Sequence, residues 1–178
     1  MSNRKLTWRT GAASCVAIGL ILLGGHVAGQ SPAVKVVSIL DRCDPVTFNN
    51  MFGAGTCVSD HPGVNVDAFL KILGNAGQIG SWHFAPGTIN LRNGQAFQPQ
   101  NDGGELHTFT EVDQFGGGFI QELNDLTGNP IPAPECLDIP HLEFIPPGGS
   151  GDTEVESPGQ HKYMCCIHPW MRATVTVR

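Results

Sequence analysis

The sequence has 178 residues, of which 40% are apolar and 15% charged, a length that suits one domain with or without an appendage. The 10 Lys and Arg residues against 16 Asp and Glu residues give a formal net charge of −6. Nucleic-acid binding requires a basic face, and no basic cluster follows the first ten positions, so the composition excludes that class.

The first 29 residues have the pattern of a secretory signal peptide. Arg4, Lys5 and Arg9 precede an uncharged apolar run over residues 11–25, and small residues follow up to Gly29. A retained membrane anchor is the alternative, but the run is short for a span of about 20 residues. We predict cleavage after Gly29, a periplasmic or extracellular protein, and no stable membrane insertion after cleavage.

Residues 30–80 are predicted to form an N-terminal extension with short helices. A strand is expected over residues 33–40, and Asp44 followed by Pro45 is typical of a helix start. A second helix is expected to end at Gly74. Its apolar residues recur at helical spacing: Val66, Phe69, Leu70 and Leu73.

Residues 81–178 have the pattern of a β domain. Short apolar runs separated by Gly and Pro turns predict strands at residues 82–84, 88–91, 95–97, 106–112, 153–156, 161–166 and 173–177. Between them, residues 113–151 are rich in Pro and Gly and are expected to be an irregular insertion, either functional or held in place by Cys136. Many short strands with such turns predict a β-sandwich or barrel.

One loop near the C-terminus carries metal-binding chemistry. Cys165, His168 and Met171 are spaced three residues apart, just before a predicted strand. Thiolate, imidazole and thioether are the ligands that suit copper changing between Cu(I) and Cu(II). A trigonal site of this kind needs a second imidazole, and His107 in the strand over residues 106–112 is the best candidate.

These residues resemble those of the cupredoxins, the small blue-copper proteins that include plastocyanin, pseudoazurin and amicyanin. The loop is most similar to that of amicyanin, which also has the pattern Cys-x-x-His-Pro-x-Met, and Tyr163 stands at a usual position before the ligand cysteine. The resemblance covers residues 81–178 apart from the insertion at 113–151. It implies an all-β Greek-key sandwich with one type 1 copper. The implied ligands are His107, Cys165, His168 and Met171.

The sequence departs from the family pattern at three places. Thr108 stands where many cupredoxins have an Asn that ties the two ligand loops together. Cys166 directly follows the ligand cysteine, a spacing that does not fit a binuclear copper centre. Strand alternation places Tyr163 and Cys165 on one face, and Met164 and Cys166 on the other. The insertion at residues 113–151 is much longer than in small cupredoxins.

With Cys165 reserved as a ligand, the remaining four cysteines after the signal allow three disulfide connectivities. We predict Cys43–Cys57, which closes a short loop over the first helix, and Cys136–Cys166, which ties the insertion to the back of the ligand loop.

The resemblance implies an electron carrier rather than an enzyme. Copper enzymes of this fold need further copper sites, and the sequence has one candidate domain and no His-x-His element. The expected partners are redox proteins that dock near His168 and Trp170, with the imidazole edge of His168 close to the surface. Alternatives are a copper-holding or structural module, an accessory domain of a copper enzyme system, or zinc in the same site, although structural zinc rarely uses Met.

Overall fold

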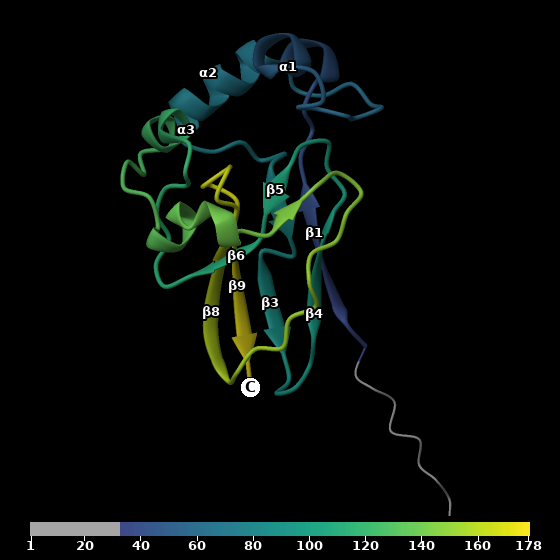
Figure 1. The fold of residues 1–178 in the computed structure, drawn as a ribbon, viewed down its shortest axis with the longest axis vertical. Helices are drawn as coiled ribbons and strands as arrows, with labels where there is room; N and C mark the ends of the chain where they lie inside the picture. Colours follow the sequence, from purple (N-terminus) through teal and green to yellow (C-terminus); the bar gives the residue numbers. More distant parts are fainter. Residues whose placement is uncertain (1–32) are drawn as a thin grey trace, which may run out of the picture. The chain divides into compact units, whose positions relative to one another are not determined.

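The computed structural model describes residues 33–178, all of which belong to one compact unit. Two mixed sheets and a short antiparallel strand pair make up most of the fold (Figure 1). The strands are β1 (Lys35–Leu40), β2 (His83–Ala85), β3 (Thr88–Leu91), β4 (Phe97–Asn101), β5 (His107–Thr108), β6 (Thr110–Val112), β7 (Phe144–Ile145), β8 (Gly159–Met164) and β9 (Arg172–Val177). The helices are α1 (Pro45–Phe52), α2 (Val66–Ala76) and α3 (Gln121–Leu126), with 3₁₀ turns η1 (Pro134–Leu137) and η2 (Ile139–His141).

The first sheet has the strand order β2-β1-β4 and the second β3-β9-β8-β6, while β5 pairs with β7. Strand β1 runs parallel to β4 and β3 runs parallel to β9; the other pairs are antiparallel. Residues 35–40, which the sequence analysis placed in an N-terminal extension, thus form the central strand of the first sheet.

One apolar core lies between the two larger sheets. It contains Val37 and Ile39 from β1 and Val175 from β9, all fully buried. The rings of Phe97 on β4 and Tyr163 on β8 meet edge to face, with centroids 5.5 Å apart. Burial of both inner faces against each other supplies the main stabilisation of such a fold. The predicted all-β sandwich is confirmed.

The helical segment after β1 begins as its sequence predicts. The Asp44 side chain accepts a 2.9 Å hydrogen bond from the backbone N–H of Thr47 and thereby caps α1. Helix α2 continues through Gly74 and ends at Ala76, because Gly77 adopts a left-handed conformation with φ 66° and closes the helix. The predicted end at Gly74 was wrong, since a glycine inside a helix is tolerated and Gly77 is the better terminator.

Two other predictions are corrected by the backbone. The single strand expected over residues 106–112 is divided into β5 and β6, which pair with different strands, β7 and β8. The insertion at residues 113–151 is not structureless, because it contains α3, two 3₁₀ turns and β7. Residues 153–156 form only an isolated bridge between Glu154 and Phe97.

The described cysteines pair as predicted. Disulfides join Cys43 to Cys57 and Cys136 to Cys166, and Cys165 stays free and buried. The alternation along β8 is also confirmed, since Cys165 lies in the main core and Cys166 in a second, smaller apolar cluster with Cys136.

Within residues 33–178, no helix is both long enough and apolar enough to cross a membrane. The predicted signal peptide, residues 1–29, lies outside the described residues.

Candidate metal centre

The four predicted ligands lie at one end of the sandwich. His107 is the first residue of β5, Cys165 follows the last residue of β8, and His168 and Met171 lie in the loop that leads to β9. All four are buried, with at most 4% of any of them exposed. Helices α1, α2 and α3 gather at this same end of the molecule (Figure 1).

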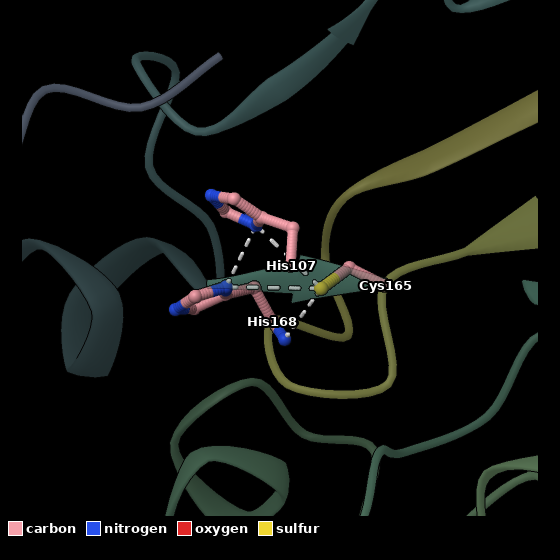
Figure 2. A group of neighbouring side chains, drawn as sticks. All are labelled: His107, Cys165 and His168. Carbon is pink, nitrogen blue, oxygen red and sulfur yellow. Dashed lines mark hydrogen bonds between the residues drawn. The ribbon is translucent and has the colours of Figure 1, made fainter. Parts of the chain in front are cut away.

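Three of these residues form a close triangle of potential ligand atoms (Figure 2). The Cys165 Sγ atom lies 3.6 Å from His107 Nδ1 and 3.8 Å from His168 Nδ1. The two Nδ1 atoms are 3.2 Å apart. Two imidazole nitrogens and one sulfur that converge in this way are the donor set of a His₂Cys copper site.

Met171 closes the loop that carries two of the ligands. Its backbone N–H donates a 2.9 Å hydrogen bond to the carbonyl of His168, and its carbonyl accepts a 3.1 Å bond from the N–H of Cys165. The side chain is fully buried in the same core. These contacts hold Met171 beside the triangle, and its role as a fourth ligand remains a prediction.

The sulfur of Cys165 lies in surroundings that favour the thiolate. Burial alone would raise the pKa of this thiol, but hydrogen bonds with His107 and His168 hold the pKa well below its usual value. The backbone N–H groups of Thr108 and His168 also point at Sγ, each at 3.4 Å. Because the thiolate is the form that binds metal, these residues fit a copper ion.

Thr108 ties the segments of His107 and Cys165 together. Its Oγ1 accepts a 2.8 Å hydrogen bond from the backbone N–H of Cys166. Its own N–H donates to Cys165 Sγ. A threonine at this position therefore joins β5 to the end of β8 through one side-chain bond and one backbone bond.

Two buried carboxylates that the sequence analysis did not single out lie behind the histidines. Asp41 Oδ2 is 2.9 Å from His107 Nε2, and both side chains are fully buried. Glu105 Oε2 is 3.7 Å from His168 Nε2 and accepts a 2.6 Å hydrogen bond from Trp82 Nε1. A carboxylate at the distal nitrogen of a ligating histidine fixes the tautomer and orients the ring.

The pKa values of His107, Asp41 and Glu105 all differ from their ordinary values. Burial alone would lower the pKa of His107, but hydrogen bonds with Asp41 and Cys165 raise it to about 9. Burial would raise the pKa of Asp41, yet its bond to His107 lowers it. Burial raises the pKa of Glu105.

A turn at Gly103 and Gly104 permits the approach of Asp41. A Cβ at Gly103 would collide with the Asp41 carboxylate, and the backbone N–H of Glu105 donates a 3.0 Å bond to the same oxygen, Oδ2. Only a residue without a side chain fits at Gly103.

The His168 side chain is almost fully buried. Its side chain is only 5% exposed, because Glu105 and Trp170 lie against it. The rings of His168 and Trp170 meet at a centroid distance of 5.3 Å, and Trp170 also contacts Phe69 of α2 at 5.9 Å. Because His168 also lines a groove that opens to the surface, access of a redox partner to its imidazole edge stays a prediction.

No family model matches the chain, and no curated protein matches it. Among solved structures, the chain is similar to a purple cupredoxin from Nitrosopumilus maritimus at 16% identity, with 81% of this chain and 99% of that one covered and a TM-score of 0.45. It is also similar to a fern plastocyanin variant at 20% identity (56% and 91% covered, TM-score 0.38). An amicyanin variant in its Cu(I) form is similar at 14% identity (54% and 73% covered, TM-score 0.36).

Proposed function

We propose that the protein binds one type 1 copper ion through His107, Cys165, His168 and Met171 and carries single electrons between redox partners. The observation that carries the proposal is the buried triangle of two imidazole nitrogens and one thiol sulfur. A copper ion bound there supplies reversible one-electron chemistry.

The chain's own residues contribute a fixed arrangement of these atoms. The bond from Asp41 holds the His107 ring, and Thr108 holds the strand of His107 against the segment of Cys165. The disulfide between Cys136 and Cys166 anchors the residue next to the thiolate. Rigid placement of ligands is what one-electron exchange requires of a protein, since small rearrangements between oxidation states keep the barrier low.

Electron transport is favoured over catalysis by the composition of the site. Within residues 33–178, the triangle of His107, Cys165 and His168 is the one cluster that combines thiolate and imidazole donors. The proposed partners are redox proteins that dock near His168 and Trp170. The acidic net charge of −6 suits a partner with a basic surface.

The proposed location is the periplasm or the extracellular space. The two disulfides fit an oxidising compartment. Export through residues 1–29 as a signal peptide is part of the same proposal.

The experiment that tests the proposal is copper loading followed by visible absorption spectroscopy. Thiolate-to-copper charge transfer is expected to give a strong band near the red end of the visible spectrum. Cys165→Ser and His168→Asn are expected to lose the band. His141→Asn is the matched control, because His141 is exposed and pairs only with Asp138. A copper-loaded protein without colour would contradict the proposal.

A second measurement separates an electron carrier from a copper-holding module. A carrier is reduced and reoxidised reversibly by one electron per copper in cyclic voltammetry. In a redox titration, its charge-transfer band near the red end of the spectrum is lost on reduction and regained on oxidation. A module that only holds copper would release the metal, or fail to regain the band, on repeated cycling.

A further inference from the structure

An apolar groove of about 660 Å³ leads from the surface to His168. Its walls come from all three helices and from both segments that carry the ligands. Three phenylalanines line it, Phe48 and Phe52 from α1 and Phe69 from α2, together with leucines that include Leu106 and Leu123. Phe52 and Leu106 are exposed at its rim, while Phe48 and Phe69 are buried.

Four polar residues line the groove: Glu105 and His168, which are buried, the half-buried Thr56 and the exposed Glu122. Glu105 uses one oxygen, Oε2, to accept from Trp82 Nε1. Its other oxygen, Oε1, has no hydrogen-bond partner among residues 33–178. In this part of the chain, the fully buried side-chain atoms that lack a partner belong to Glu135 and Trp170. Glu105 Oε1 is not among them, so it keeps some accessible surface. A buried carboxyl group therefore presents one free acceptor to an aromatic-lined groove.

The volume and lining of the groove suit a small molecule. Pockets of about 300–1,000 Å³ with apolar walls and few convergent polar groups are typical small-molecule sites. Phenylalanine rings favour an aromatic ligand, because stacked and edge-to-face contacts add to the area that is buried. A free carboxyl oxygen accepts a hydrogen bond in either protonation state, so it favours a ligand with a donor group.

We propose that this groove binds a small phenol-class molecule, with its ring against Phe48, Phe52 and Phe69 and its hydroxyl donating to Glu105 Oε1. A hydroxyl is favoured over an ammonium because moving a charge into an apolar groove costs more than moving a neutral donor. The proposal goes beyond electron transport between proteins, and binding does not require copper. It places a small molecule next to the distal edge of one proposed ligand.

The test is calorimetric titration of the copper-free and copper-loaded protein with 4-methylphenol, toluene and benzylamine. We expect 4-methylphenol to bind both forms, about tenfold more tightly than toluene, the ratio that one hydrogen bond to a carboxylate supplies. Benzylamine is expected to bind more weakly than 4-methylphenol. Binding that is equal for 4-methylphenol and toluene, or tightest for benzylamine, would overturn the proposed ligand class.

Two substitutions locate the bound molecule. Leu106→Ala is expected to weaken 4-methylphenol binding several-fold, whereas Leu137→Ala, the same change at an exposed leucine outside the groove, leaves it unchanged. Phe52→Ala at the exposed rim is expected to act like Leu106→Ala and provides a second variant if Leu106→Ala disturbs β5. Equal effects of Leu106→Ala and Leu137→Ala would overturn the location.

The two proposals fail separately in this design. Phenol binding in a protein that stays colourless with copper would reject the electron-carrier proposal and leave the groove as a binding site. A blue protein to which 4-methylphenol does not bind would reject the groove and leave the copper site.

Discussion

The two proposed histidine ligands differ in what lies behind them. His107 Nε2 is 2.9 Å from Asp41, and neither side chain has any exposed surface. His168 Nε2 is 3.7 Å from Glu105, beyond hydrogen-bond distance, and its ring lines an apolar groove. His107 is therefore enclosed by protein on all sides, whereas the His168 ring can be approached through the groove.

The sequence positions of the two carboxylates explain the difference. Asp41 directly follows β1, the central strand of its sheet. It lies 66 residues before His107 in the sequence, and the pairing of β1 with β4 and the turn at Gly103 place the two side chains in contact. Glu105 and His168 lie on loops, and no hydrogen bond joins their side chains. Electron exchange is accordingly expected on the His168 side.

The largest effect is expected at Asp41. Asp41→Asn removes the buried charge that supports the protonated His107, whose pKa is raised to about 9 in the copper-free protein. Breaking a buried ion pair costs about 3 kcal/mol in the free energy of unfolding, which urea denaturation of the copper-free protein measures. Asp138→Asn is the matched control, because its pair with His141 is exposed and is worth less than about 1 kcal/mol. Equal losses of unfolding free energy in Asp41→Asn and Asp138→Asn would contradict the expected difference between a buried and an exposed pair.

The next effect concerns Trp170, which packs between His168 and Phe69. Trp170→Ala is expected to cost about 2 kcal/mol of unfolding free energy, because the half-buried indole loses these contacts. The same change is expected to disturb the visible spectrum or weaken copper retention. An unchanged spectrum would contradict this packing role, and slower electron exchange with a redox partner would then leave Trp170 with the proposed docking role alone.

A smaller effect is expected at Glu105. Glu105→Gln keeps the shape of the side chain and an acceptor for Trp82 Nε1, and the separation from His168 is already 3.7 Å. The expected loss is about 1 kcal/mol of unfolding free energy in urea, clearly below that of Asp41→Asn. A loss of unfolding free energy equal to or larger than that of Asp41→Asn would mean that Glu105 holds His168 as firmly as Asp41 holds His107.

The smallest effect is expected at His161 on β8, away from the metal centre. Its 2.7 Å hydrogen bond with Glu111 raises the pKa of His161 above its ordinary value of 6.5. A raised pKa in the folded state means that the stabilisation is complete below pH 6.5 and is lost as the pH rises through the raised value. The stability difference between the protein and His161→Gln is therefore expected to be below about 1 kcal/mol and to shrink above pH 6.5.

Unfolding free energies measured at several pH values check this prediction. His141→Gln serves as the control, since His141 makes an exposed pair within one short turn. A stability difference between the protein and His161→Gln that grows as the pH rises would contradict the predicted pH dependence.

The sequence predicted which residues meet at the candidate site better than it predicted what surrounds them. The spacing of Cys165, His168 and Met171 is local, so a single loop brings them together, and strand alternation correctly separated Cys165 from Cys166. The pairing of Cys136 with Cys166 followed from that separation. Signals of this kind depend only on neighbouring residues.

The remaining features depend on contacts between distant segments. No local pattern connects Asp41 with His107, because their contact arises only when β1 joins the sheet beside β4. The division of residues 106–112 at Phe109 arises because β5 and β6 pair with different partners. The burial of His168 likewise depends on α2, whose apolar stripe was predicted but whose position was not.

X-ray absorption spectroscopy at the copper edge tests the central claim most directly. For the copper-loaded protein, we predict one sulfur ligand at short distance and two imidazole nitrogens, with the short sulfur contribution absent in Cys165→Ser. Copper surrounded only by oxygen and nitrogen, or a sulfur contribution that persists in Cys165→Ser, would contradict the assignment of the triangle of His107, Cys165 and His168 as a copper site.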